Sequence, residues 1–330
     1  MTDSKLKLLK FLYSHYSLSG ELFDLPSYID VNFLLKADNG NKYVIKLASI
    51  QTCIDEIKLE NAAMLHLQSK AITIATPHLI KSKSNKTILD YQIPNEEGTR
   101  KIRVISFLEG KLYSQSNSQD PNLQYSLGVL VAKMVEALQD FNHTATRRTL
   151  SWDIAQLLDL EKNLCHFQGA KLEILSRAFI EFKEVCYPQL IQLPKQVIHN
   201  DANDNNLIVN ESKNKFFCSG IFDFGDLVYT HRICELAIAI TYALFECDDI
   251  LQASKIIVNG YCHYTTLQDD ESRALYYLIK ARLLQSLLNS GKSLSIKPDN
   301  SYLHISNLPA WELLEKLNNI DSQLFYKNIK

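Results

Sequence analysis

The chain has 330 residues, of which 46% are hydrophobic and 22% charged, the composition of an ordinary globular protein. This length is ample for a sizeable core and suits one large two-lobed domain or two modest ones. The formal net charge of −2 gives no indication of a nucleic-acid or membrane-surface protein. The longest apolar run, Leu236–Phe245, is too short to cross a membrane.

The seven cysteines are scattered, their number is odd, and no C-x-x-C pair occurs among them. This pattern favours reduced thiols over a disulfide framework or a zinc site. The first ten residues are polar and lack the apolar core of a secretory signal. We therefore expect a cytoplasmic protein with no nucleic-acid or membrane partner, either a monomer or a homodimer.

The first third of the chain is rich in predicted strands. Asn39-Gly40 predicts a tight hairpin turn between a strand in the second half of residues 25–38 and a returning strand over Lys42–Leu47. Apolar residues at helical spacing predict two helices in this part, over residues 4–16 and 50–69. Two further strands are predicted over residues 87–93 and 99–108, joined by a turn at 94–98.

From Pro121 onward, helical spacing dominates the sequence. Helices are predicted over residues 123–141, 152–167, 170–186, 232–245, 249–264, 269–288 and 310–317. Between the third and fourth of them lie short apolar runs typical of strands, such as Val197-Ile198 and Leu207-Ile208-Val209. The chain is therefore predicted to be α+β, with a small β-rich lobe at 1–108 and a larger, mainly helical lobe at 109–330.

Two polar motifs follow these strand-like runs. The first is His-x-Asp-x-x-x-x-Asn, formed by His199, Asp201 and Asn206, and the second is Asp-Phe-Gly, beginning at Asp223. In this order, they are typical of the catalytic loop and the metal loop of protein-kinase-like phosphotransferases. Asp201 suits the base that accepts the proton of the attacking hydroxyl. Asn206 and Asp223 suit Mg²⁺, which prefers oxygen ligands, and His199 suits a brace for the loop.

Two other interpretations of the first motif are less favourable. Asp and Asn are common in ordinary turns because their side chains hydrogen-bond the nearby backbone, but a turn does not explain the paired motifs. A calcium loop starting at Asp201 would need glycine at its sixth position and glutamate at its twelfth, where Asn206 and Ser212 stand. The paired spacing therefore favours a protein-kinase-like, two-lobed fold.

The β-rich lobe carries the residues expected to meet the nucleotide. Lys46 lies near the end of a strand, and Glu60 lies in the following helix, deeper than Glu56. In a kinase fold, such a lysine reaches the nucleotide phosphates and is held by the glutamate. The stretch Ser106, Phe107 and Leu108 ends the last strand before the helices, where backbone groups of a hinge would meet the purine base.

These stretches resemble the small-molecule kinases of the aminoglycoside phosphotransferase and choline kinase type, and within them the hydroxylysine kinase group. The resemblance covers nearly the whole chain. It rests on residues 25–33, 43–47, 60–64, 197–206, 221–226, 234–239, 298–303 and 309–311. It implies Asp201 as the catalytic base, Mg²⁺ held by Asn206 and Asp223 with Asp226 nearby, and ATP or GTP as phosphate donor. The loop at 27–32 has no glycine, so Ser27 or backbone N–H groups would have to meet the phosphates there.

The resemblance also implies an amino-acid alcohol as acceptor, with 5-hydroxy-L-lysine as the best choice. The chain lacks the Ala-Pro-Glu motif of protein kinases, which favours a small acceptor. An ammonium group would meet Asp204, Asp226 or Glu235. A carboxylate would meet Arg232 or Arg282, although a surface or helix-pairing salt bridge explains each arginine better than a substrate role does. Homoserine, choline, ethanolamine, an aminoglycoside, a sugar and a nucleotide-binding pseudokinase remain alternatives.

Overall fold

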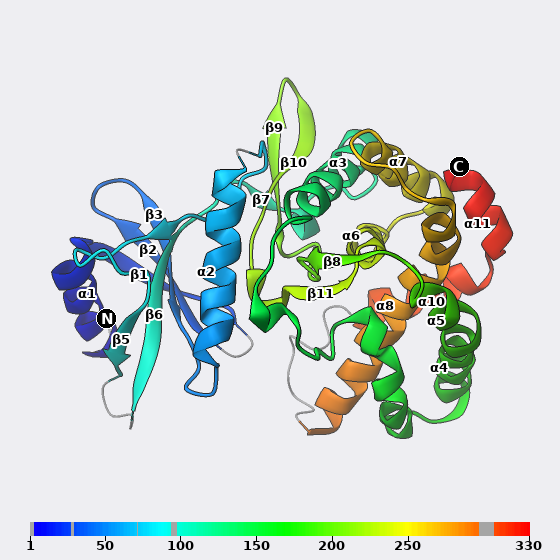
Figure 1. Ribbon diagram of the computed structural model, residues 1–330, viewed down its shortest axis with the longest axis horizontal. Coiled ribbons are helices and arrows are strands. Elements are labelled where there is room, and N and C mark those ends of the chain that lie inside the picture. Colours follow the sequence, from blue (N-terminus) through cyan, green and yellow to red (C-terminus); the bar gives the residue numbers. More distant parts are fainter. Residues whose placement is uncertain (1–2, 28–29, 71, 94–97, 297–306) are drawn as a thin grey trace. The chain divides into compact units, whose positions relative to one another are not determined.

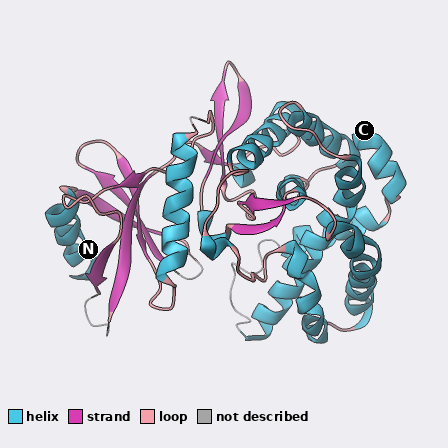
Figure 2. Ribbon diagram, viewed as in Figure 1, coloured by secondary structure: helices cyan, strands magenta, loops and turns pink. Residues whose placement is uncertain are grey.

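A computed structural model describes residues 3–27, 30–70, 72–93, 98–296 and 307–330. The chain divides into two compact units, Met1–Glu109 and Gly110–Lys330 (Figure 1). The first unit is built on an antiparallel sheet, and the second consists mainly of helices (Figure 2). No helix among the described residues is long and apolar enough to cross a membrane.

The sheet of the first unit has the strand order β1-β2-β3-β6-β4, with β5 also paired to β6. Every neighbouring pair in it is antiparallel. The elements of this unit are α1 (Asp3–Tyr16), β1 (Gly20–Leu25), β2 (Val31–Ala37), β3 (Lys42–Leu47), α2 (Ile54–Ser69), β4 (Leu79–Ile80), β5 (Leu89–Gln92) and β6 (Thr99–Ser106).

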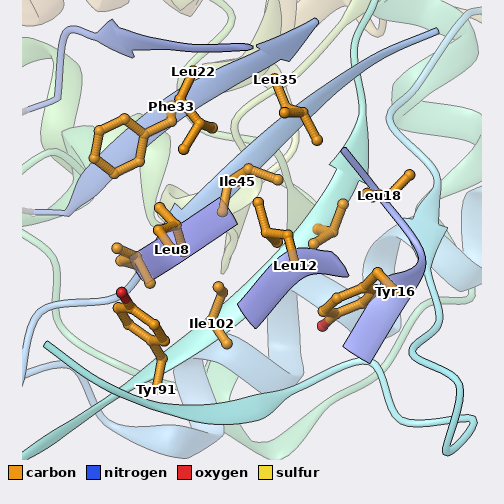
Figure 3. Close-up of a cluster of buried hydrophobic side chains, with 12 residues drawn as sticks. Leu8, Leu12, Tyr16, Leu18, Leu22, Phe33, Leu35, Ile45, Tyr91 and Ile102 are labelled. Carbon is orange, nitrogen blue, oxygen red and sulfur yellow. The ribbon is translucent and has the colours of Figure 1, made fainter. Parts of the chain in front are cut away.

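Side-chain alternation along the strands gives this sheet two different faces. On β6, Ile102 and Val104 join the apolar core in which Leu8 and Leu12 of α1 are buried (Figure 3). Arg103, between them in sequence, points to the opposite face and contacts α2. Full burial of each core leucine or isoleucine contributes about 1.5–3 kcal/mol, so the α1 face holds the unit together. The α2 face is where charged residues are placed.

The first unit differs from the sequence prediction at several places. Strand β1 and the two-residue β4 were not predicted, and α2 begins at Ile54 rather than near residue 50. The backbone N–H of Cys53, just before α2, donates to the Glu56 carboxylate at 3.3 Å, which marks the start of the helix. The predicted turn at 94–98 lies largely outside the described residues.

The second unit holds two small sheets, β10-β9-β7 and β11-β8, among its helices. Its main elements are β7 (Lys111–Leu112), α3 (Pro121–Ala137), the 3₁₀ helix η3 (Ile154–His166), α4 (Gly169–Glu181), α5 (Tyr187–Leu190), β8 (Lys195–Ile198), β9 (Leu207–Ser212), β10 (Lys215–Ile221), β11 (Val228–His231), α6 (Ile233–Ala243), α7 (Ile250–Cys262), α8 (Asp269–Ile296), α10 (Asn307–Asn318) and α11 (Ser322–Ile329).

All residues of helix α6 are buried, so this helix lies in the interior of the second unit. A helix that is apolar all round must be enclosed by other elements, and its sequence fits this position. The helices α3 and α7 cross closely at two glycines. A Cβ atom at Gly128 would lie 1.9 Å from the Ile257 carbonyl oxygen, so this crossing requires glycine.

Two predictions in the second unit were wrong in detail. Residues 154–166 form a 3₁₀ helix rather than an α-helix, and the buried residues of η3 are Ile154, Leu157, Leu160 and Asn163. Their spacing of three matches the three residues per turn of a 3₁₀ helix, which places them in one row. Strand β11 lies between Asp226 and α6, in a stretch where no strand was predicted.

Candidate active site

The first polar motif forms a loop between two strands that belong to different sheets. β8 ends at Ile198 and pairs with β11, whereas β9 begins at Leu207 and pairs with β10. A second segment fixes the loop through Ser114, whose backbone N–H donates to the Asp204 carbonyl at 2.9 Å and whose hydroxyl donates to Asn205 at 2.9 Å. This loop, residues 199–206, is called the catalytic loop below after its predicted role. It is held by strands at both ends and by Ser114 in its middle.

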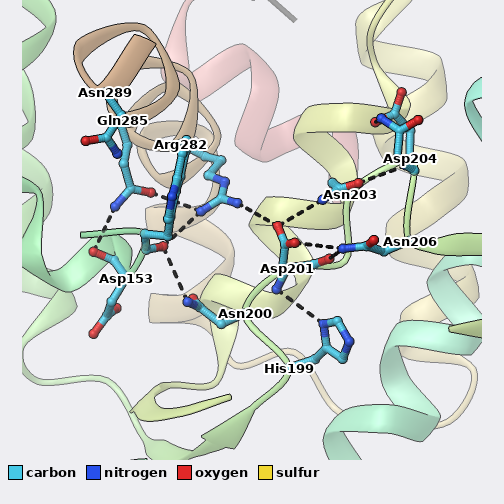
Figure 4. Close-up of polar contacts among 12 residues, drawn as sticks. Asp153, His199, Asn200, Asp201, Asn203, Asp204, Asn206, Arg282, Gln285 and Asn289 are labelled. Carbon is cyan, nitrogen blue, oxygen red and sulfur yellow. Dashed lines mark hydrogen bonds and ion pairs between the residues drawn. The ribbon is translucent and has the colours of Figure 1, made fainter. Parts of the chain in front are cut away.

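The Asp201 carboxylate is surrounded by donors (Figure 4). Its Oδ1 accepts from Arg282 at 3.1 Å and from Asn203 at 2.9 Å, and its Oδ2 accepts from Asn206 at 2.7 Å. A carboxylate has about four acceptor sites, two on each oxygen. Among the described residues, no donor takes the second site on Oδ2. The side chain is 21% exposed, so this oxygen is oriented but not sealed from solvent.

Three carboxylates lie within electrostatic range of one another at this loop. Burial and the charge of Asp226 raise the pKa of Asp201 above its ordinary value, and Asp223 adds to this effect. The Arg282 guanidinium acts in the opposite direction. The neighbouring negative charges oppose ionisation of Asp201, and a bound cation would relieve this effect.

His199 connects the two polar motifs. Its ring is fully buried, its Nε2–H donates to the Phe222 carbonyl at 3.1 Å, and its Nδ1 accepts from the Asp201 backbone at 3.3 Å. These partners fix one tautomer. Burial lowers the pKa of His199 to about 4, so the ring is neutral near pH 7. It also meets the Phe224 ring edge-on, with 4.9 Å between centroids.

The second motif adopts a backbone shape that requires support. Asp223 has a φ of +65°, in the left-handed region that few residues other than glycine adopt. Arg148 donates to the carbonyl oxygens of Gly225 and Leu227 and so holds the far side of the turn. Strained residues of this kind persist only where their surroundings fix them. Arg148 was not predicted, since an isolated arginine in a loop carries no sequence signal.

Two of the candidate substrate residues, Arg282 and Glu235, are buried and hydrogen-bond the catalytic loop. The Arg282 side chain is 1% exposed and donates to the Trp152 carbonyl at 2.8 Å and to Gln285 at 3.1 Å, besides Asp201. Glu235 is 1% exposed and accepts from the Asn200 backbone at 2.9 Å. Asn200 itself has a φ of +67°, so Glu235 stabilises a strained residue next to Asp201.

The other substrate candidates fall into two groups. Arg232 donates two hydrogen bonds to Glu271, at 2.7 and 2.8 Å, which is the helix-pairing salt bridge named as the alternative. Asp204 lies in the catalytic loop, where burial raises its pKa to about 6, and Asp226 lies beside Asp201. Asp204 and Asp226 are therefore the substrate candidates that the structure places at this loop.

The first unit brings together the predicted lysine and glutamate. The Lys46 ammonium lies 3.6 Å from Glu60 Oε2, and each side chain is 12% exposed. The same oxygen accepts from Arg103 at 2.9 Å, and Arg103 also donates to Asn61 at 3.1 Å. Arg103 was missed, although a charged residue inside the apolar run Ile102–Ile105 was a signal that it needs a buried partner.

Two of the residues predicted to form the hinge, Ser106 and Phe107, hydrogen-bond other residues of the first unit. The Ser106 backbone N–H donates to the His78 carbonyl at 2.9 Å, and that of Phe107 donates to the Lys42 carbonyl at 3.2 Å. Two of the three residues predicted to meet a purine base therefore already use their backbone N–H groups within the first unit. Ser27 is exposed, and residues 28–29 of its loop lie outside the described part of the chain.

The residues expected to bind the metal are Asn206, Asp223 and Asp226, and each has a side-chain oxygen. The Asn206 amide nitrogen is used by Asp201, so its oxygen is the atom that it can offer to a cation. Within the described residues, no group of three His, Cys, Asp or Glu side chains is placed to hold a metal. The set of Asn206, Asp223 and Asp226 fits Mg²⁺, which keeps several waters and takes the rest of its ligands from nucleotide phosphates.

This combination of an antiparallel lobe, a helical lobe and paired polar loops defines a kinase-like phosphotransferase. A sequence model of the phosphotransferase enzyme family matches residues 25–274, and the chain belongs to that family. It is 28% identical to mouse hydroxylysine kinase over 315 residues, which cover 89% of this chain and 83% of that protein. The α+β fold and the enzyme class predicted from the sequence are confirmed.

Solved structures share the fold across nearly the full length. A microcompartment-associated aminopropanol kinase superposes with a TM-score of 0.72 at 16% identity, covering 94% of this chain and 97% of that one. An amicoumacin kinase, solved in complex with AMP-PNP and Ca²⁺, superposes with a TM-score of 0.70 at 16% identity, covering 98% and 97%. At this identity, the likeness establishes the architecture.

Proposed function

We propose that this phosphotransferase is a Mg²⁺-dependent kinase that moves the γ-phosphate of ATP or GTP to the hydroxyl of a small amino-acid alcohol, with 5-hydroxy-L-lysine as the preferred acceptor. The observation that carries the proposal is the Asp201 carboxylate, held by three donors with one acceptor site on Oδ2 left over. The likeness to mouse hydroxylysine kinase over most of both chains supports the choice of acceptor.

In this proposal, Asp201 accepts the proton of the acceptor hydroxyl at Oδ2. Arg282 and Asn203 hold Oδ1, so the carboxylate cannot rotate away from the incoming hydroxyl. Orientation of this kind is a large part of catalysis in phosphoryl transfer, where the protein supplies positioning and charge stabilisation. His199 stays neutral and holds the loop rather than exchanging a proton.

Asn206 and Asp223, with Asp226 beside them, are the proposed ligands of Mg²⁺. When bound, the metal would neutralise charge on the nucleotide phosphates. In the first unit, Lys46 is the proposed partner of the phosphates and Glu60 the residue that orients it. Ser27 and the stretch Ser106, Phe107 and Leu108 are the proposed contacts to phosphate and base.

The acceptor is proposed to use its ammonium group as the main charged contact. Asp204 and Asp226 remain candidates for that contact. Arg232, Glu235 and Arg282 are not retained as substrate residues, because each is already engaged with protein partners and two of them are 1% exposed. Leaving a buried partner unpaired costs about 1–3 kcal/mol, which opposes their transfer to a substrate.

This loss of arginine candidates favours a second kind of acceptor, an amino alcohol without a carboxylate. Both arginines that could bind a carboxylate have other partners. The fold relative with a TM-score of 0.72 is an aminopropanol kinase, which supports the same alternative. Aminopropanol, ethanolamine and choline therefore stand beside hydroxylysine, ahead of homoserine and the aminoglycosides.

The test is a coupled nucleotide-turnover assay with a panel of acceptors and with ATP and GTP in parallel. The panel holds 5-hydroxylysine, homoserine, aminopropanol, ethanolamine, choline and one aminoglycoside. Stimulation by hydroxylysine above all others supports the first proposal. Stimulation by amino alcohols alone selects the second, and turnover unaffected by any acceptor, with nucleotide still bound, contradicts both.

A further inference from the structure

Arg103 occupies an unusual place in the sheet of the first unit. It lies on β6 directly opposite Lys46 on β3, in an antiparallel pair of strands. Two cations at directly opposed positions repel each other and destabilise a sheet unless an anion lies between them. The Arg103 side chain is 1% exposed, so water cannot screen its charge well. Glu60 of α2 is the anion that makes this arrangement possible.

Glu60 is shared unequally between the two cations. Arg103 Nη2 donates to Glu60 Oε2 at 2.9 Å, a normal charge-assisted hydrogen bond, whereas the Lys46 ammonium lies 3.6 Å from the same oxygen. The second arm of the guanidinium donates to Asn61, the next residue of α2, at 3.1 Å. The fork of Arg103 thus holds two successive residues of the helix, which a lysine cannot reproduce.

We infer that Arg103 is a positioning residue for the phosphate-binding lysine. By holding Glu60 through the shorter contact, Arg103 prevents Glu60 and Lys46 from closing into a tight neutral pair. The Lys46 ammonium is then directed to anionic phosphate oxygens at a smaller cost than if it first had to leave Glu60. This inference rests on the proposed function, in which Lys46 meets the phosphates of a nucleoside triphosphate.

A charge count over these three side chains explains the expected effect of a substitution. Lys46 and Arg103 carry one positive charge each and Glu60 one negative charge, so the three together carry one positive charge. In Arg103→Met, the charges of Lys46 and Glu60 sum to zero, and Glu60 no longer has the shorter contact that held it away from Lys46. The variant therefore loses attraction for phosphate but not for a nucleoside, which carries no charge.

The first measurement needs no nucleotide. Double-mutant cycles in urea unfolding compare two pairs, Arg103→Met with Glu60→Gln and Lys46→Met with Glu60→Gln. We expect the coupling between Arg103 and Glu60 to be the larger of the two. A larger coupling between Lys46 and Glu60 overturns the inference, whatever the enzyme binds. If Arg103→Met does not fold, the same cycle is run with Arg103→Lys.

The second measurement is calorimetric binding of ATP and adenosine, and of GTP and guanosine, without acceptor. In Arg103→Met, the charge-assisted contact between Lys46 and the phosphates is weakened. We expect this to lower the affinity for the triphosphate roughly tenfold. We expect the affinity for the nucleoside to stay unchanged and Arg103→Lys to recover part of the loss. The matched control, Lys101→Met, removes an exposed cation of the same strand β6, which pairs with Asp90 of β5, and it should change neither affinity.

The outcomes separate the inference from the function on which it rests. Equal loss of nucleoside and triphosphate binding in Arg103→Met means a purely structural role and overturns the inference, as does no loss at all. If the wild-type chain binds neither ATP nor GTP, the proposed function fails, and the double-mutant cycles still decide whether Arg103 or Lys46 is the principal partner of Glu60.

Discussion

Replacement of Arg282 by methionine removes the cation that holds Asp201, the proposed base. Arg282 donates to two neutral acceptors, the Trp152 carbonyl and the Gln285 side chain, and to the Asp201 carboxylate. Its guanidinium also stacks on the Trp152 ring, 4.9 Å from its centroid. All three bonds are charge-assisted because the donor is a guanidinium, and at about 1.5 kcal/mol each, the lower end of their range, they sum to about 4.5 kcal/mol. This lies in the range of about 3–5 kcal/mol for breaking a buried ion pair.

The same substitution should lower turnover through the orientation of Asp201. With Oδ1 held only by Asn203, the carboxylate gains rotational freedom, and misplacement of a reacting group by about 1 Å can cost roughly 100-fold in rate. We therefore expect kcat to fall roughly 10–100-fold in the folded fraction, with nucleotide affinity unchanged. Urea unfolding followed by circular dichroism gives the stability, and acceptor-stimulated nucleotide turnover gives kcat.

A matched control separates the two effects. Lys280 lies on the same helix α8 as a buried cation and contacts Glu181, away from the catalytic loop. Lys280→Met should lower the free energy of unfolding but leave kcat of the folded enzyme unchanged. The reasoning is refuted if Arg282→Met turns over at the wild-type rate, or if Lys280→Met loses as much kcat as Arg282→Met.

Two other predictions concern the metal loop and acid stability. Asp223→Ala should abolish the Mg²⁺-dependent part of nucleotide affinity, measured by calorimetry with and without Mg²⁺; an unchanged affinity for Mg·ATP would remove Asp223 from the proposed ligands. His231 is buried and donates to the Leu193 carbonyl at 3.0 Å, and burial lowers its pKa from 6.5 to about 4. The unfolded chain therefore binds a proton below pH 6.5 that the folded chain takes up only near pH 4, so stability is lost as the pH falls between these values. From pH 7 to pH 5 this group should cost about 2 kcal/mol. His231→Asn, which keeps a donor for Leu193, should reduce the pH dependence of urea unfolding by that amount, and an identical pH dependence of both proteins would contradict the assignment.

The parts of the fold that sequence patterns could predict are those with a strong local period or turn. The Asn39-Gly40 hairpin and most helices of the second unit have such signals, and they lie close to the predicted positions. Strand β1, with exposed or half-exposed residues at most positions, shows little apolar pattern and was missed. Its antiparallel pairing with β2 stabilises an extended backbone that its own sequence pattern does not predict.

The site was predictable to the extent that its residues lie together in sequence. His199, Asp201 and Asn206 share one loop and contact one another, as their spacing predicted. Arg282 reaches the same loop from 81 positions away in the chain, and no local pattern indicates which of several arginines does so. The contact of Arg103 with Glu60 likewise depends on how β6 faces α2, which only tertiary structure decides.

The most direct test of the account is acceptor-stimulated, Mg²⁺-dependent nucleotide turnover by the wild-type chain and by Asp201→Asn, measured beside nucleotide binding to both. A general base contributes roughly 10²–10⁴-fold to rate. The account predicts a loss of turnover of that size in Asp201→Asn, with nucleotide affinity retained. Turnover that continues at the wild-type rate without the Asp201 carboxylate would contradict its role as the base and, with it, the mechanism proposed for this phosphotransferase.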